Sequence, residues 1–340
     1  MDVKLIRISG HQMLKKKYND YLLFFGNLYF LYYIIRSNTN MGDLNSDQTT
    51  QKYTNLVLEG GGVLGVAYCG ALRSLHEKGI LKNISNFAAS SVGSIIAGAL
   101  ACGATFNFLE FELNNLNFSD LLDCSTSKIK NAYDLYYYYG ICEGQKLIDW
   151  YGAILYKLTG NSEITLKEVH ERFGGRLVVT GTVIGKHRRT VLFDYKSYPD
   201  MKLKIAIRIS SSLPIIFKPY LFENEYYVDG GLLENYPIKA FHTITDGESF
   251  VNENTIGLML MQTTEITDEY QEITDLKTFL QSIIGTLLNP PQKQQMEPSD
   301  WDRTIKINVG NVSSINFRID ERDKKFLFER GQEAVIKYFV

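Results

Sequence analysis

Residues 86–98 read NFAASSVGSIIAG, and this stretch decides the interpretation of the whole chain. A short apolar run ends at two serines, and small and branched residues with helical spacing follow, which predicts a strand, a turn and a helix. Ser91 stands at the turn, where a nucleophile elbow exposes its hydroxyl. The elbow motif is G-x-S-x-G; Gly93 fills its last position, but Ala89 stands at the first. Taken alone, Ser91 fits a helix N-cap equally well.

Strands and helices alternate around this stretch. An apolar run in 54–60 leads through a glycine-rich turn into a helical pattern, and the run in 84–90 leads through the serines into a second one. This order predicts parallel strands joined by right-handed crossovers. Residues 104–172 read as mostly helical, with a tyrosine-rich connection at 133–140. Further elements are expected as strands at 176–184, 189–195, 220–228 and 255–262 and as a last helix near 320–339.

The bulk composition is that of a folded domain and excludes some partners. The 340 residues are 45% hydrophobic and 22% charged, and 36 Lys and Arg face 38 Asp and Glu. This balance provides no broad basic surface, so we expect no nucleic-acid partner. The cysteines are widely spaced and form no C-x-x-C pair, so we expect no zinc site, and reduced thiols in a reducing compartment. They are Cys69, Cys102, Cys124 and Cys142.

The first 52 residues differ from the rest and are predicted to be an N-terminal extension to a domain at 53–340. Residues 21–35, YLLFFGNLYFLYYII, are mostly apolar, but as a helix they would span roughly 22 Å against a hydrocarbon core of roughly 30 Å. Three interpretations stay open: an N-terminal membrane anchor or interfacial helix, a helix packed on the main domain, and a leader. The run MGDLNS at 41–46 fits an N-myristoylation acceptor only if translation starts at Met41.

The loop LEGGGVLG at 58–65 carries four glycines between a predicted strand and helix. Gly60, Gly62 and Gly65 formally satisfy the dinucleotide-binding fingerprint G-x-G-x-x-G. A dinucleotide site also needs an acidic residue near the end of the second strand, and no Asp or Glu occurs between Glu77 and Glu110. Backbone N–H groups of such a loop can instead form an oxyanion hole.

Ser91 needs a base if it is a nucleophile, and the sequence favours a carboxylate. None of the five histidines follows a strand beside small residues. In YYVDGGLLENYP at 226–237, Asp229 follows a strand run and precedes Gly230 and Gly231, so its side chain can reach a neighbour without obstruction. A plain hairpin turn remains the alternative for this segment.

Together these blocks resemble the patatin-like phospholipase family. The resemblance rests on GGGVLG at 60–65, ASSVG at 89–93, DGG at 229–231 and the serine-rich ISSSLPIIFKPY at 209–220, and covers about residues 53–240. It implies a three-layer α/β/α fold with a central, mostly parallel sheet. It also implies a catalytic dyad of Ser91 and Asp229 with no cofactor or metal. Further residues follow from the same motifs: Gly61, Gly62 and Val63 as oxyanion hole, and Gly60, Gly65, Gly93, Gly230 and Gly231 as motif glycines.

The implied function is that of a serine lipid acyl hydrolase of phospholipase A or lysophospholipase type. Its substrate would be a phospholipid or other acyl lipid at a membrane or micelle surface, reached by a cytoplasmic protein peripheral on membranes. We expect 213–219 to line an acyl channel and Tyr136–Tyr139 to form a lid or an interfacial surface. Two positions depart from the family pattern: Ala89, and Leu64 where Arg or Lys is frequent. A silent lipid-binding relative and, less favoured, a dinucleotide-binding oxidoreductase stay open as alternatives.

Overall fold

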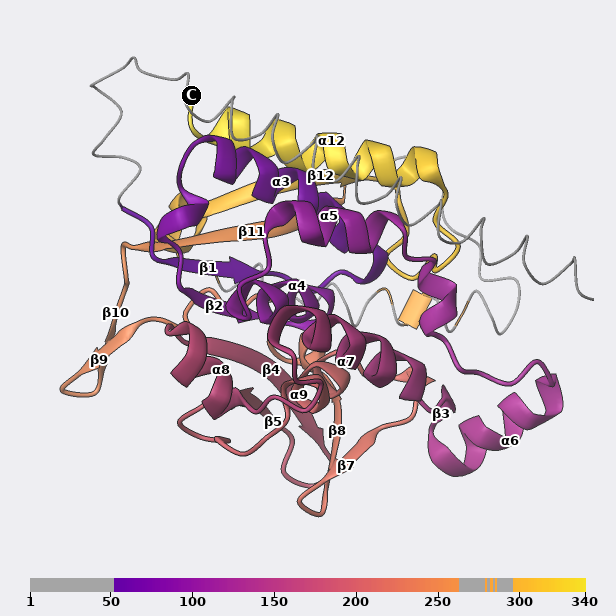
Figure 1. Cartoon of the computed structure of the whole chain (residues 1–340). Coiled ribbons are helices and arrows are strands. Elements are labelled where there is room, and N and C mark those ends of the chain that lie inside the picture. Colours follow the sequence, from indigo (N-terminus) through magenta and orange to yellow (C-terminus); the bar gives the residue numbers. More distant parts are fainter. Residues whose placement is uncertain (1–51, 263–278, 280–281, 284, 286–295) are drawn as a thin grey trace, which may run out of the picture. The chain divides into compact units, whose positions relative to one another are not determined.

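The computed structural model describes residues 52–262, 279, 282–283, 285 and 296–340 (Figure 1). Residues 1–51 lie outside this set, so the extension, its 21–35 segment and the Met41 motif stay predictions. No helix in the described part of the chain is long and apolar enough to cross a membrane.

An eight-stranded mixed sheet forms the centre of the described domain, in the order β12-β11-β1-β2-β4-β8-β7, with β5 also paired to β4 (Figure 1). The five strands from β12 to β4 run parallel, while β5 and β8 are antiparallel to β4, and β7 to β8. The predicted α/β fold with a mostly parallel sheet is confirmed. The strands of this sheet are β1 Asn55–Leu58, β2 Asn86–Ala89, β4 Leu177–Ile184, β5 Arg189–Phe193, β7 Tyr220–Phe222, β8 Glu225–Asp229, β11 Thr255–Gln262 and β12 Thr304–Gly310.

Two short strand pairs lie outside this sheet. β3 (Gly140–Cys142) runs parallel to β6 (Ile215–Phe217), and β9 (Thr243–Thr245) forms a hairpin with β10 (Glu248–Phe250). The β3–β6 pair joins the tyrosine-rich region to the predicted acyl-channel segment.

Both faces of the sheet are covered, which gives the three layers. Leu56 and Leu58 point into the larger core under the helices, whereas Val57 between them points to the other face. There it packs near Tyr236, Ile238 and the short helix α11. The helices are α3 Val66–Glu77, α4 Ser91–Ala101, α5 Phe106–Asn114, α6 Lys128–Tyr138, α7 Gln145–Thr159, α8 Leu166–Phe173, α9 Leu203–Ser210, α11 Pro298–Asp302 and α12 Glu321–Tyr338; the single-turn 3₁₀ helices are η1 Gly62–Gly65, η2 Leu81–Asn83, η3 Phe118–Leu121 and η4 Gly230–Leu232.

The tyrosine-rich stretch predicted as a connection is instead the helix α6, which projects at the lower right of Figure 1. The Ser127 side chain caps its first turn by accepting from the Lys130 N–H, and the helix ends where Tyr139 turns left-handed at φ 64°. Aromatic residues are weak helix formers, so the tyrosine run hid the capped helix from the sequence pattern.

The single strand predicted at 220–228 is two strands, β7 and β8. Glu223 and Asn224 between them adopt φ of 48° and 63°, the positive values that a two-residue hairpin turn requires. The correction matters because it sets Asp229 at the end of β8, beside β4.

The expectation of four reduced thiols is wrong for one pair. Cys124 and Cys142 form a disulfide with their Cα atoms 4.1 Å apart, and this bond encloses the whole of α6. Spacing alone gave no signal for it, because β3 brings Cys142 back after the helix. Cys69 and Cys102 are free and buried, and burial raises the pKa of each thiol to about 12.

Candidate active site

Ser91 lies in a sharp turn between β2 and α4. Its φ is +48°, in the left-handed region that costs a residue other than glycine about 1–3 kcal/mol. Two residues on, a side chain at Gly93 would bring Cβ within 2.7 Å of the Glu59 carbonyl oxygen and 2.8 Å of the Leu58 carbonyl oxygen. The glycine therefore lets α4 begin directly against the end of β1, which is the geometry of a nucleophile elbow.

Ala89 and Leu64, the two departures from the family pattern, both pack in the apolar core. Ala89 is fully buried and aligned with Leu58 and Val179 in the sheet. Leu64 is buried in the same core cluster. The methyl group of Ala89 is therefore accommodated on the core side, and the turn at Ser91 is kept.

Asp229 lies at the end of β8, opposite Gly181 of β4, and is fully buried. Its Oδ2 accepts a hydrogen bond of 2.8 Å from the Ser91 Oγ, and its Oδ1 accepts one of 2.7 Å from the Gly231 N–H. The following Gly230 is tightly confined, because an added Cβ would lie 2.1 Å from the Thr180 Oγ1. The chain thus turns away from β8 at once and leaves the carboxylate facing the serine.

Burial raises the pKa of Asp229 to about 7 from a usual value of 3.8, although the hydrogen bonds from Gly231 and Ser91 act in the opposite direction. A carboxylate with this pKa is a much stronger base than an exposed Asp, and at neutral pH a large fraction is still ionised. The site therefore has the proton affinity that a general base for a serine hydroxyl needs.

The serine-rich segment at 209–213 holds both residues of this pair. The Ser91 backbone N–H donates to the Ser210 Oγ at 2.9 Å, and the Asp229 backbone N–H donates to the Ser212 carbonyl at 2.9 Å. Ser210 and Ser212 are both fully buried. In the sequence this segment was recognised only as part of the family pattern. Its hydrogen bonds to Ser91 and Asp229 became visible only in the folded structure.

The glycine loop lies against the serine. A Cβ at Gly60 would be 3.0 Å from the Ser91 Cβ, and Gly62, with φ +55°, lines the same cavity as Ser91. Within the described residues the Gly61 and Gly62 N–H groups donate to no protein acceptor, whereas the Val63 N–H donates to the Ser314 carbonyl at 3.0 Å. The loop thus places Gly62 beside the cavity at Ser91 with an N–H that no described protein group accepts, whereas Ser314 occupies the Val63 N–H.

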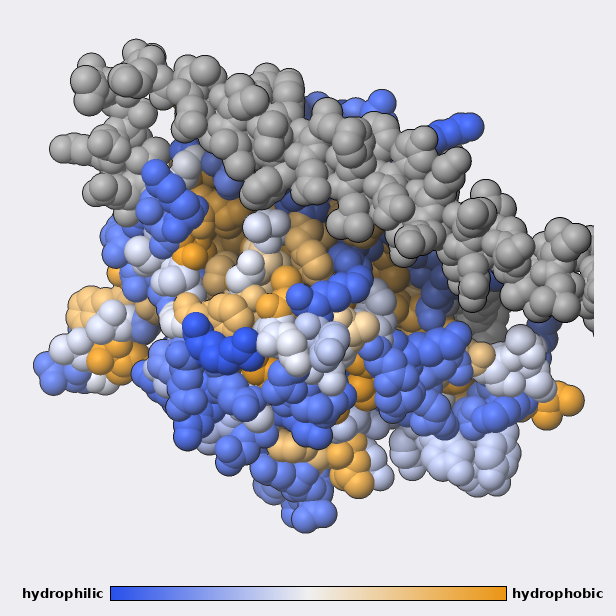
Figure 2. All heavy atoms as spheres, in the orientation of Figure 1, coloured by the Kyte–Doolittle hydropathy of each residue, from blue (hydrophilic) through white to orange (hydrophobic). Residues whose placement is uncertain are grey.

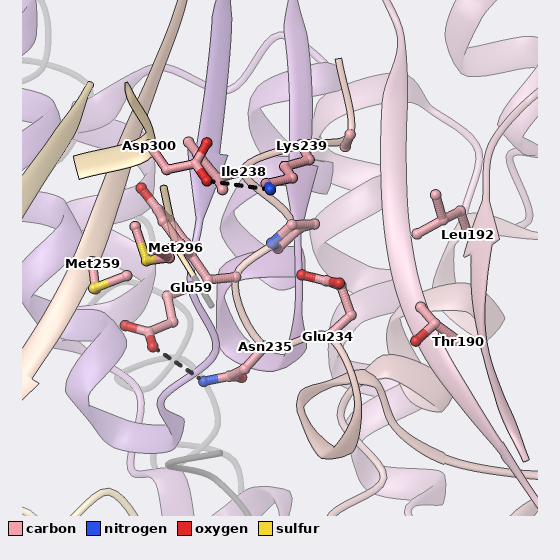
Figure 3. A pocket seen from close by; sticks show the side chains of 13 residues that line it. Glu59, Thr190, Leu192, Glu234, Asn235, Ile238, Lys239, Met259, Met296 and Asp300 are labelled. Atoms are coloured by element: carbon pink, nitrogen blue, oxygen red, sulfur yellow. Dashed lines mark hydrogen bonds and ion pairs between the residues drawn. The ribbon is translucent and has the colours of Figure 1, made fainter. Parts of the chain in front are cut away.

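Asn235 connects the glycine loop with the Asp229 turn, and the sequence analysis did not single it out. Its carbonyl accepts from the Gly60 N–H at 3.0 Å, and its Nδ2 donates to the Gly60 carbonyl at 3.2 Å and to a carboxylate oxygen of Glu59 at 3.4 Å (Figure 3). Its Oδ1 occupies the space that a Cβ on Gly60 or Gly231 would need. The second oxygen of Glu59 accepts from the Leu260 N–H at 2.7 Å. One buried amide therefore fixes the spacing between both halves of the site.

An apolar cavity of about 50 Å³ begins at Ser91 and Gly62. Leu213 and Phe217 line it, so part of the predicted channel segment 213–219 is at the cavity, while Ile215 and Ile216 pack in the adjoining cluster. The remaining walls come from α4, from α5 and the turn after it, from η3 and α7, from the end of α9 and from the segment after β12: Val92, Ile95, Leu113, Leu116, Phe118, Leu121, Leu147, Trp150, Ser211 and Phe317.

A larger cavity of about 440 Å³ lies on the other face of the sheet (Figure 3). Glu59, Glu234 and Lys239 line it, but neither Ser91 nor Asp229 does. Burial raises the pKa of Glu234 to about 7, although Lys239 acts to lower it. The described residues contain no cluster of His, Cys, Asp and Glu arranged to hold a metal ion.

Comparisons with known proteins identify the family of the chain. A family model described as patatin-like phospholipase matches residues 56–242. Uncharacterized protein R571 of Acanthamoeba polyphaga mimivirus is 30% identical over 290 residues, which are 83% of this chain and 92% of that protein. Probable lipid hydrolase 463L of Invertebrate iridescent virus 6 is 32% identical over 186 residues, 55% of this chain and 62% of that protein.

Among solved structures, VipD from Legionella pneumophila superposes with a TM-score of 0.56 at 17% identity, over 84% of this chain and 66% of that one. This likeness shows a shared fold. The chain spans nearly all of the mimivirus relative but just under two thirds of the other two proteins. The family match covers more than half of the chain, and it removes the support for a dinucleotide-binding fold. The chain belongs to the patatin-like phospholipase family.

Proposed function

We propose that this protein hydrolyses fatty-acyl esters of lipids, with Ser91 as nucleophile and Asp229 as general base. The observation that carries the proposal is the 2.8 Å hydrogen bond from the Ser91 Oγ to a buried Asp229 carboxylate whose pKa is about 7. A serine hydroxyl alone is a weak nucleophile, and an adjacent base activates it.

In the acylation step Asp229 takes the proton of Ser91 as the Oγ attacks the ester carbonyl carbon. The carbonyl π electrons move to oxygen, and the resulting oxyanion is stabilised by loop N–H groups. When the tetrahedral intermediate collapses, the C–O bond to the alcohol breaks and Asp229 returns the proton to that alcohol. Water then attacks the acyl-serine, again with Asp229 as base, and releases the fatty acid and Ser91.

The oxyanion hole belongs to Gly61 and Gly62, the loop residues whose N–H groups have no protein acceptor in the described residues. One well-placed donor contributes about 3–4 kcal/mol to transition-state stabilisation. Val63, the third member of the predicted set, donates to the Ser314 carbonyl, so it joins the hole only if the turn that carries Ser314 withdraws.

The substrate class follows from the cavity at Ser91. Its described lining is almost wholly apolar, as an acyl chain requires, and the relatives carry names such as probable lipid hydrolase and triacylglycerol lipase. Both phospholipids and neutral acylglycerols are therefore candidate substrates.

The proposed partner surface is a lipid aggregate, and α6 is the element that contacts it. Ile129 is 84% exposed and Tyr136 is 76% exposed, and Figure 2 shows pale and orange atoms in the projecting α6 region. Tyrosines favour the membrane–water interface, and an exposed lysine such as Lys128 favours anionic lipids. The β3–β6 pair connects α6 to Phe217 in the cavity wall.

The test measures fatty-acid release from mixed phospholipids and from triacylglycerol by wild type, Ser91→Ala and Asp229→Asn. We expect release by wild type and loss in both variants. Equal release by all three proteins would overturn the dyad. Lipid binding without release by the wild type would favour the silent lipid-binding alternative.

A further inference from the structure

A second, polar hollow adjoins the apolar cavity at Ser91. This surface hollow has a volume of about 380 Å³, and both spaces are bordered by the same three side chains: Leu116, Leu121 and Trp150. Leu116 lies in the turn after α5, Leu121 in η3 and Trp150 in α7, and together they form a wall between an apolar chamber and a polar hollow.

The periodicity of α7 explains how one helix serves both sides. Leu147 and Trp150, three residues apart, share the row that faces the cavity. Lys146 and Asp149, one position earlier, share the row that faces the hollow. Trp150 borders both spaces because its side chain is large, and it is half-buried.

Residues 116–121, which precede α7 in the chain, also divide their side chains between the cavity and the hollow. Phe118 faces the cavity only, and Asn117 and Asp120 face the hollow only. Leu116 and Leu121 border both, so the wall is one side chain thick at each of the three positions. The hollow is open at the surface and rimmed by charged groups, including Glu112 and Lys146, so the wall separates an apolar space from a polar one.

We propose that Trp150 is the residue that limits acyl-chain length, by closing the cavity against the polar hollow. This inference rests on the proposed function. At about 50 Å³ the cavity is small beside the roughly 300–1,000 Å³ of ordinary ligand sites, so a long chain needs a second space. Removing the indole joins the chamber to the hollow and lets a long chain pass through.

The experiment measures how fast hexyl, decyl and hexadecyl fluorophosphonates label the protein, with Ser91→Ala as blank. We expect Trp150→Ala to raise the hexadecyl-to-hexyl rate ratio about tenfold or more over wild type. The matched control is Trp301→Ala, which removes the chain's other tryptophan, also half-buried, from the opposite face of the sheet. The ratio within one preparation is independent of how much of the protein is folded.

Trp150→Leu and Leu116→Ala probe the same wall from two elements and protect the test against a Trp150→Ala variant that fails to fold. A raised ratio in these variants, with Trp301→Ala like wild type, supports the proposal. An unchanged ratio in folded wall variants, or an equal rise in Trp301→Ala, overturns it. A wild type that reacts with none of the probes overturns the proposed function itself, so the two failures are distinguishable.

Discussion

One cavity on each face of the sheet contains a carboxyl group of raised pKa or lies beside one, but the linings of the two cavities differ: one is charged and the other apolar. The larger, about 440 Å³, contains charged groups including Glu234, whose pKa is about 7. The smaller, about 50 Å³, is apolar and begins at Ser91, whose Oγ donates a hydrogen bond to Asp229; the pKa of Asp229 is also about 7. Size and a raised carboxyl pKa do not single out the smaller cavity; the hydrogen bond between a buried carboxylate and a serine hydroxyl at a strand end does.

The largest expected effect comes from neutralising one carboxyl in each cavity. Asp229→Asn should lower kcat/KM for an acyl ester about 10⁴-fold, because it removes the base and leaves the shape. Glu234→Gln, five residues further on, should change it less than about twofold, since Glu234 lies outside the Ser91 cavity. Equal losses in the two variants would place the chemistry elsewhere.

Asn235 connects the two regions, because it borders the large cavity and also holds the glycine loop beside the small one. Asn235→Ala should lower kcat about 10²-fold with little change in KM, since displaced oxyanion donors weaken transition-state binding more than substrate binding. Steady-state kinetics on a soluble ester, with melting temperatures measured in parallel, make the test. A rise in KM alone, or a loss of activity that follows loss of folded protein, would contradict this positioning role.

The pH dependence of kcat/KM distinguishes the carboxyl of Asp229 from that of Glu234. Only ionised Asp229 accepts the Ser91 proton, so kcat/KM should fall about tenfold per pH unit below pH 7 and reach a plateau above it. The Glu234→Gln variant should show the same fall of kcat/KM below pH 7. If this fall is absent in Glu234→Gln, Glu234 and not Asp229 is the base.

The same raised pKa of Asp229 predicts that the stability of the fold falls as the pH rises, whereas the activity increases. The folded pKa of Asp229 lies above its unfolded value of about 3.8, so its contribution to stability is greatest below pH 4 and is lost as pH rises through 7. Asp229→Asn should therefore melt at the same or a higher temperature than wild type at pH 8. A clearly lower melting temperature would mean that the carboxylate stabilises the fold.

The smallest expected effect is at α6, which lies outside both cavities. Ile129→Ser with Tyr136→Ser should weaken sedimentation with phosphatidylserine-containing vesicles roughly tenfold, since two exposed apolar groups are lost. Activity on a soluble ester should stay unchanged. The matched control is Ile244→Ser with Phe250→Ser on the β9–β10 hairpin, where both side chains are also exposed. Equal weakening in both double variants would remove α6 as the specific contact.

The sequence predicted the parts of the site that local backbone geometry imposes. Ser91, Asp229 and the glycine loop follow strand ends, and tight turns there leave recognisable small residues such as Gly93 and Gly230. The parallel sheet followed from the alternation of strands and helices.

The rest depended on contacts between distant segments. Asn235 meets Glu59 across 176 positions, and the wall at Trp150 is assembled from three segments whose polar and apolar residues look like ordinary amphipathic helices. The pair Cys124 and Cys142 lacked a spacing signal, and the tyrosine run masked α6. Ala89 could be judged only once its methyl group was placed in the core.

The central claim, that Asp229 activates Ser91, is tested most directly by mapping the site of a fluorophosphonate adduct by mass spectrometry in wild type, Asp229→Asn and Glu234→Gln. We expect an adduct on the peptide containing Ser91 in wild type and Glu234→Gln, and labelling slowed about 10³-fold or more in Asp229→Asn. An adduct on another serine, or equal labelling of Ser91 in Asp229→Asn and wild type, would contradict it.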